Sequence, residues 1–165
     1  MQLVAELSEG HSAASRLYAT PAFPAGAGPD FVNAVMRIET SLTPDALLQK
    51  LHAIEAAALR KRTVRWGQRT LDLDLIAVDD LVLPDAATHA HWRDLPLDRQ
   101  MQEAPQTLIL PHPRMQDRAF VLVPLMDVAP TWVHPVLGQS VSDLCAAIPA
   151  ADRATVVPLT DSENT

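Results

Sequence analysis

The sequence contains one cysteine, few aromatic residues and no long hydrophobic run. Only 4% of its 165 residues are Phe, Trp or Tyr. The single cysteine, Cys145, cannot form an internal disulfide, and its Leu and Ala neighbours are typical of a small buried side chain rather than a nucleophile. No stretch approaches the roughly 20 apolar residues of a membrane helix, and the N-terminus lacks a basic and then apolar signal pattern. We therefore expect a cytoplasmic protein with no membrane partner.

A net basic charge is also absent, because the formal charge of the chain is −7. Nucleic-acid-binding proteins usually gain affinity from basic surfaces and from aromatic side chains that stack on bases, so we expect no nucleic-acid partner. The positive charge is concentrated in the segment 56–71, which has no acidic residue. We call its basic residues the basic island: Arg60, Lys61, Arg62, Arg65 and Arg69. A local excess of positive charge in an acidic protein indicates a small anionic ligand.

The length and the 48% hydrophobic content predict one domain over residues 1–150 and a tail over 151–165 that has little to bury. We expect this domain to be a monomer. The segment 84–106 has scattered prolines and no sustained period, which is typical of a surface insertion that forms a loop.

Two early strands are predicted on either side of a Pro- and Gly-rich loop. The first, Ser12–Thr20, ends at Pro21 because proline cannot continue a hydrogen-bonded ladder. The second starts at Phe31 and alternates, so Phe31 and Asn33 share a face that is open to a ligand. The opposite, core face consists of Val32, Ala34, Met36 and Ile38.

A helix is predicted next, with Thr43 as its cap and Pro44 at its first position. His52 and Glu55 lie three residues apart and therefore on the same side of this helix. After this helix the sequence predicts a strand at 71–78, a returning strand at 81–83, a strand that starts near 118 and a helix at 140–148. This order predicts an α+β fold, a ferredoxin-like two-layer sandwich whose mostly antiparallel sheet packs against helices.

The sequence Leu-Asp-Leu-Asp-Leu at 71–75 is the sharpest chemical feature of the chain. The two-residue period of a strand places Asp72 and Asp74 on one face and the leucines in the core. Mg²⁺ typically binds one or two carboxylates together with substrate phosphates. On the pattern alone a solvated strand face is the more frequent explanation, but the adjacent basic island favours a phosphate-bound metal.

A second cluster surrounds His112, which lies between two prolines that restrict its backbone. Arg118 and Phe120 follow two residues apart, so on a strand they would offer a charge and an aromatic face in one direction. A lone histidine is usually structural, and ordinary packing remains the alternative explanation for Phe31. The occurrence of both segments in one chain favours a functional explanation more strongly than either segment does alone.

Both segments resemble signatures of the hydroxymethyl-dihydropterin pyrophosphokinases. The first is RWGQRTLDLDLI at 65–76, and the second is HPRMQDRAF at 112–120. The segments 18–21 and 31–33 also resemble the pterin-side segments of this family. The resemblance covers about residues 15–130, apart from the insertion at 84–106. It implies transfer of a diphosphate from ATP to a pterin alcohol in folate biosynthesis.

The resemblance implies a role for each matching residue. Asp72 and Asp74 would hold two Mg²⁺ ions, and Arg65 and Arg69 would act on the triphosphate. The nucleotide would also be bound by His52, Glu55, Arg60, Arg62, Leu75, His112 and Arg118. The pterin would be bound by Thr20, Pro21, Phe31, Asn33, Trp66 and Phe120, with Trp66 in a loop that closes over both substrates.

Members of this family normally begin with an apolar strand and a Gly-Ser-Asn turn, and this turn is absent here. The resemblance therefore implies that about two dozen residues, one strand and most of a helix, are missing. A start assigned too far downstream is the favoured explanation; a shortened chain and pairing with a second copy are the others. A truncated domain that binds Mg²⁺ and nucleotide with little catalysis is the alternative function, and RNA binding is a disfavoured third.

Overall fold

The computed structural model describes residues 1–21, 30–60, 71–100 and 102–160. The first half contains α1 (Gln2–Ala5), β1 (Ser12–Ala14), β2 (Tyr18–Thr20), β3 (Phe31–Asn33), β4 (Met36–Ile38) and α2 (Pro44–Arg60). The second half contains α3 (Ala86–Arg93), α4 (Leu97–Gln100), the 3₁₀ helix η1 (Met115–Asp117), α5 (Ala119–Val128), α6 (Val141–Ala147), α7 (Ala150–Ala154) and β5 (Val157–Pro158). Antiparallel strands and helices together make the fold α+β, as predicted.

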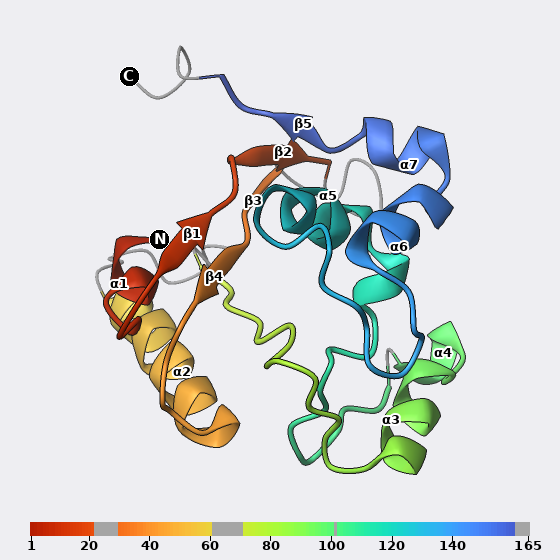
Figure 1. The fold of residues 1–165 in the computed structure, drawn as a ribbon, viewed down its shortest axis with the longest axis horizontal. Helices are drawn as coiled ribbons and strands as arrows, with labels where there is room; N and C mark the ends of the chain where they lie inside the picture. The colour runs from red at the N-terminus through yellow and green to blue at the C-terminus, as the bar shows by residue number, and fades with distance from the viewer. Residues whose placement is uncertain (22–29, 61–70, 101, 161–165) are drawn as a thin grey trace.

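The strands form two small antiparallel sheets (Figure 1). In one sheet β1 pairs with β4, and in the other β2 lies between β3 and β5. Each long strand predicted from the sequence is therefore split into two. Ser15 explains the break, because its hydroxyl replaces a backbone acceptor and receives the Val35 N–H at 2.9 Å.

The predicted core face of the second strand is partly wrong. Val32 is 60% exposed and Ala34 is exposed, whereas Met36 and Ile38 are half-buried as expected. Val35 packs against the core instead. At the interruption between β3 and β4, two consecutive side chains point inward. The alternation of inward- and outward-facing side chains is therefore shifted by one residue.

The C-terminal tail buries more than the sequence indicated. Val156 is buried, and Val157 of β5 pairs with Ala19 of β2. The Leu159 N–H also donates to the Leu17 carbonyl at 2.8 Å. This tail adds an edge strand to the second sheet, so residues up to 159 belong to the packed structure.

The predicted helix after β4 is confirmed as α2. Thr43 caps it, because its hydroxyl accepts the Ala46 N–H at 3.3 Å and its carbonyl accepts the Leu47 N–H at 2.9 Å. Leu47 and Leu51 are buried on one side of the helix. His52 is exposed and Glu55 half-buried, so both remain accessible from the same flank.

Residues 71–85 cross from the α2 side of the molecule to the α3 side (Figure 1). The predicted strand at 71–78 is not part of either sheet, and Leu83 forms an antiparallel bridge with Leu110 rather than returning along 71–78. A strand needs a neighbour that completes its ladder, and no described residue supplies one here. The predicted alternation nevertheless holds locally, since Asp72 and Asp74 are exposed and Leu73 is half-buried.

Two further predictions are wrong. The segment 84–106 contains α3 and α4 rather than only loop, and its His89 is completely buried. Asp85 caps α3 by accepting the Thr88 N–H at 2.9 Å. The residues from 119 onward form helix α5 instead of a strand, because a continuous apolar run has no period that separates the two structures.

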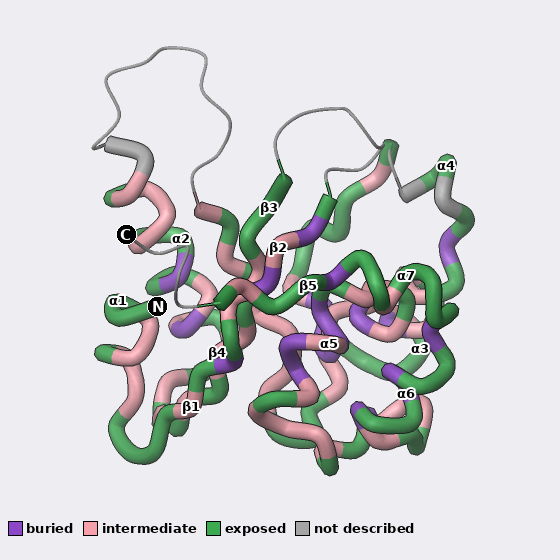
Figure 2. Tube along the Cα trace, turned by 90° about the horizontal axis from the view of Figure 1, so that it is seen from above, coloured by how far each residue is buried: buried purple, intermediate pink, exposed green. Residues whose placement is uncertain are grey.

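The main core lies between α5 and α6. Its buried residues include Met115, Leu122, Val141 and Leu144, and Figure 2 shows buried positions gathered on these helices and on neighbouring β2. Ser140 and Asp143 form a capping box that confirms the predicted last helix as α6. Cys145 is buried in this core, and burial raises the pKa of its thiol, as expected for an inert residue.

An ion pair fastens α5 to the strand region. The Asp127 carboxylate accepts hydrogen bonds from the Arg16 Nε at 3.1 Å, the Arg16 Nη2 at 2.8 Å and the Tyr18 hydroxyl at 2.8 Å. These donors lower the pKa of Asp127 to about 2. Because α5 starts beside Arg118 and β2 ends at Thr20, this contact fixes two predicted site segments relative to one another.

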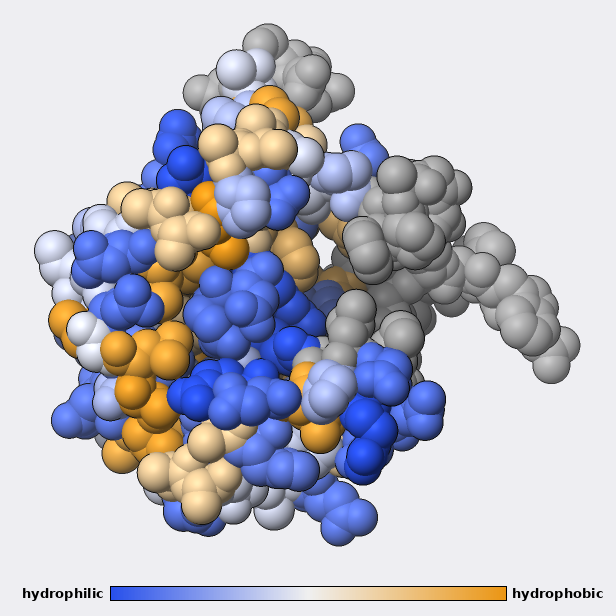
Figure 3. Space-filling view, turned by 90° about the vertical axis from the view of Figure 1, so that its right-hand side faces the viewer, coloured by the Kyte–Doolittle hydropathy of each residue, from blue (hydrophilic) through white to orange (hydrophobic). Residues whose placement is uncertain are grey.

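No helix within the described ranges is long and apolar enough to cross a membrane. The face formed around α3, α4 and α6 carries hydrophilic side chains near its centre, with smaller hydrophobic groups beside them (Figure 3).

Candidate active site

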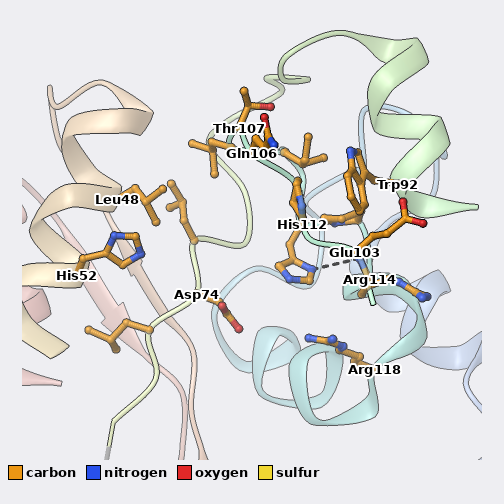
Figure 4. A pocket seen from close by; sticks show the side chains of 16 residues that line it. Leu48, His52, Asp74, Trp92, Glu103, Gln106, Thr107, His112, Arg114 and Arg118 are labelled. Atoms are coloured by element: carbon orange, nitrogen blue, oxygen red, sulfur yellow. Dashed lines mark hydrogen bonds between the residues drawn. The ribbon is translucent and has the colours of Figure 1, made fainter. Parts of the chain in front are cut away.

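A cavity of about 580 Å³ lies between α2, the segment 73–75, α3 and the segment 103–118. Leu48 and His52 line one side, and Trp92 and Glu103 line the opposite side (Figure 4). The other lining residues are Leu73, Asp74, Leu75, Pro105, Gln106, Thr107, Leu108, Ile109, His112, Pro113, Arg114 and Arg118. The cavity therefore joins an apolar end to a strongly charged end.

Asp74 faces the cations of the second signature. In Figure 4 its carboxylate points toward Arg118, with His112 on the same side of the cavity. This carboxylate favours the charged forms of both groups, but burial dominates and lowers the pKa of each below its ordinary value. The acidic residue of one signature and two basic residues of the other thus share one electrostatic site.

His112 is held by its backbone and by one ring nitrogen. Its N–H donates to the Ile76 carbonyl at 2.7 Å, which ties it to the segment that carries Asp74. Its Nδ1 accepts the Arg114 N–H at 3.1 Å. The neutral ring therefore carries its proton on Nε2, because Nδ1 is used as an acceptor. Burial, and then the nearby Arg118, lower the pKa of His112, so near pH 7 the ring is a neutral hydrogen-bond donor.

The predicted pterin residues that the structure describes belong to β2, β3 and α5 or, for Pro21, directly follow β2, and α5 contacts both strands. Phe31 is 51% exposed and Phe120 is 40% exposed. Thr20 pairs with Phe31 across the strands, and its hydroxyl accepts a hydrogen bond from the Asn33 amide at 2.6 Å. The guanidinium carbon of Arg118 is 5.6 Å from the centroid of the Phe120 ring.

The two predicted nucleotide residues of α2 have different surroundings. His52 lines the cavity. Glu55 instead accepts the Leu73 N–H at 2.7 Å and so anchors the segment that bears the two aspartates. Leu75, predicted to contact the nucleotide, also lines the cavity.

Asp72 and Asp74 are the candidate metal ligands. Both are exposed, while the leucines on either side of each are half-buried. Carboxylates suit Mg²⁺, which keeps waters and binds substrate phosphates rather than needing a full protein cage. Within the described ranges, no cluster of three or more His, Cys, Asp or Glu side chains could hold a metal.

Most of the basic island lies outside the described residues, namely Lys61, Arg62, Arg65, Arg69 and the side chain of Arg60. The predicted Trp66 lies outside them as well.

Several cavity residues were missed by the sequence analysis. Arg114 belongs to the second signature, lines the charged end, and contacts Asp117 at 3.7 Å. Its place next to His112 was a usable signal. Trp92, Glu103 and Gln106 come from the segment that was interpreted as a surface loop. No periodicity distinguished them, because their position depends on how α3 packs rather than on local sequence.

Comparison with known proteins agrees with the site. Residues 1–130 match the family model of 7,8-dihydro-6-hydroxymethylpterin-pyrophosphokinase, HPPK. The chain belongs to this family. The match includes Asp74, His112 and Arg118, the signature residues that line the charged end of the cavity.

Similar proteins include the 2-amino-4-hydroxy-6-hydroxymethyldihydropteridine pyrophosphokinases of Synechocystis sp. and Pseudomonas aeruginosa. The first is 39% identical over 130 residues, which are 79% of this chain and 56% of that protein. The second is 39% identical over 137 residues, which are 83% of this chain and 72% of that protein. The folic acid synthesis protein fol1 of Pneumocystis carinii is 33% identical over 79% of this chain and 15% of its own length. The chain thus spans between about half and three quarters of its bacterial relatives.

Proposed function

We propose that the protein transfers a diphosphate group from ATP to 6-hydroxymethyl-7,8-dihydropterin, and releases AMP, as a step of folate biosynthesis. The observation that carries this proposal is the meeting of Asp74 with His112 and Arg118 at one end of a cavity, in a chain of the HPPK family. Opposite charges placed at one cavity end suit a metal-bound polyphosphate, because the metal and the cations neutralise different oxygens.

The triphosphate lies at the charged end of the cavity. Arg118 supplies a planar guanidinium, and His112 donates from Nε2 to a phosphate oxygen. Arg60, Arg62, Arg65 and Arg69 add positive charge from the basic island. The nucleoside lies at the apolar end, between His52 on α2 and Trp92 on α3, next to Leu75. Glu55 contributes by holding the 73–75 segment.

Asp72 and Asp74 would hold two Mg²⁺ ions against this triphosphate. When bound, the ions supply charge neutralisation and alignment of the phosphate groups. The pterin lies between Phe31 and Phe120, whose exposed rings suit the faces of a flat bicyclic system. Asn33 and Thr20 bind its polar edge beside Pro21, and Trp66 closes over it.

In the reaction, the hydroxymethyl oxygen of the pterin forms a bond to the β-phosphorus of ATP. The bond between this phosphorus and the oxygen bridging to the α-phosphate breaks, AMP leaves, and the hydroxyl proton passes to solvent. Phosphoryl-type transfer depends mainly on alignment and charge stabilisation, so a dedicated base is not required. Arg118 and His112 act by orienting phosphate oxygens and stabilising their negative charge.

The proposal extends to the molecule as a whole. Its strands and helices would form a ferredoxin-like two-layer sandwich, in a cytoplasmic monomer whose partners are ATP and the pterin rather than nucleic acid or a membrane.

Quantifying AMP release with and without the pterin alcohol tests the proposal. We expect AMP and pterin diphosphate in equal amounts, and no AMP without the pterin or without Mg²⁺. Release of AMP that does not depend on the pterin would contradict the proposal. Calorimetry that shows Mg·ATP binding while no product forms would support the alternative of a nucleotide-binding domain.

A further inference from the structure

A pair of fully buried histidines lies behind the cavity and is not part of it. His89 of α3 and His134, from the turn before α6, are both 0% exposed. Their ring centroids are 5.8 Å apart, and the rings meet edge to face. Buried imidazoles are costly unless they are neutral and hydrogen-bonded, so their partners reveal what they hold in place.

The partners of His89 determine its tautomer. Its Nε2 lies 3.0 Å from the Pro111 carbonyl oxygen, which can only accept, so Nε2 must carry the proton. Burial lowers the pKa of His89, in keeping with a neutral ring. The Pro111 carbonyl belongs to the peptide bond that leads into His112. His89 therefore holds the backbone immediately before the residue that donates into the charged end of the cavity.

His134 supports His89 from the other side. Its Nδ1 accepts the Val136 and Leu137 N–H groups, both at 3.2 Å, so its proton lies on Nε2. Within the part of the chain that the structure describes, the His134 Nε2 and the His89 Nδ1 are buried and have no hydrogen-bond partner. One of these two ring nitrogens is a donor and the other an acceptor. Through the contact of its two rings, the pair links the turn at 134–138 to α3.

We propose that His89 is a positioning residue for His112, acting through the Pro111 carbonyl. The Pro111–His112 corner is then fixed from three directions: by His89 behind it, by the Ile76 carbonyl beside it and by the Arg114 N–H at the His112 ring. This arrangement gives the segment 84–106 a function, since α3 both lines the cavity with Trp92 and orients His112 with His89. The catalytic consequence of this inference rests on the proposed function.

Two amide substitutions separate positioning from simple packing. In His89→Gln the side-chain amide nitrogen reaches the place of Nε2 and can still donate to Pro111. In His89→Asn the amide is shorter by one methylene and cannot reach it. We expect the Asn variant to lower turnover about tenfold, as is typical when the partner that orients a functional histidine is lost, and the Gln variant to stay within about twofold of the unsubstituted chain.

A measurement that needs no turnover is the ¹⁵N spectrum of the His112 ring in the full chain, which reports its tautomer. We expect the Nε2–H tautomer in the unsubstituted chain and in His89→Gln, and a mixture in His89→Asn. If the Asn variant does not fold, His89→Leu replaces it.

Identical His112 spectra and turnover in folded Gln and Asn variants would overturn the inference, as would a Gln variant that does not fold or that alters the His112 spectrum. A chain without pterin-dependent turnover whose His112 tautomer still follows the Gln and Asn pattern would contradict the proposed function and leave the positioning role standing.

Discussion

The Asp127 contact predicts a measurable and pH-dependent part of the stability of this fold. In Asp127→Asn the side chain keeps its size but loses its charge and one acceptor oxygen, while Arg16 and Tyr18 still present their donors. The change tests whether this carboxylate fastens α5 to the strand region as the geometry indicates.

The expected magnitude follows from the pKa of Asp127, which is about 2 in the folded chain and 3.8 for the ordinary side chain. A shift of this size corresponds to roughly 2.4 kcal/mol at most. The Arg16 side chain is 62% exposed, so solvent screens the pair. We therefore expect Asp127→Asn to lower the free energy of unfolding by about 1 to 2 kcal/mol at pH 7.

Urea unfolding at several pH values provides the assay. The folded pKa of Asp127 is depressed, so its stabilisation is present above about pH 3.8 and is lost as the pH falls toward 2. The difference between the two proteins should shrink over this window. Asp80→Asn, which removes an exposed carboxylate from the 79–80 turn, is the control. Equal stability of the Asp127 variant and the control at pH 7 would refute the reasoning.

The remaining predictions concern two histidines. Burial, and then the neighbouring His89 and Arg93, lower the pKa of His134 to about 4 in the folded chain. The contribution of the neutral His134 ring to the stability of the fold is therefore complete above pH 6.5 and is lost as the pH falls through about 4. His134→Asn keeps an acceptor near the Nδ1 position but does not titrate, and unfolding experiments should show a flatter pH dependence over this window; an unchanged slope would argue against it. Asp74→Asn removes the charge that favours the protonated His112, so NMR titration without Mg²⁺ should give a lower pKa for His112, and a higher one would contradict the placement of Asp74.

Local signals in the sequence predicted part of the fold correctly. The Thr43 cap predicted from the sequence marks the start of α2, because capping depends on residues a few positions apart. The helix predicted at 140–148 is α6. The inert, buried Cys145 also followed from its neighbours. The α5 helix did not, because the run that contains Leu122 is apolar on every side and its conformation is decided by packing.

Short patterns predicted where some candidate residues are exposed. The alternation at 71–75 correctly predicted that Asp72 and Asp74 are exposed and that Leu73 is partly buried, although no ladder forms among the described residues, since alternation depends on the backbone rather than on a partner strand. Trp92 and His89 could not be predicted in the same way. Their roles depend on contacts between α3 and the 109–112 segment, which are distant in the sequence.

The central claim is that Asp72 and Asp74 hold Mg²⁺ on ATP opposite His112 and Arg118. Pterin-dependent AMP release by the variant Asp72→Asn with Asp74→Asn tests it most directly, beside Asp79→Asn with Asp80→Asn, which removes the same charge a few residues later. We predict a loss of about 1,000-fold or more for the first pair, as expected when charge neutralisation is removed from phosphoryl transfer, and nearly unchanged turnover for the second. Equal turnover in the two double variants would contradict the account.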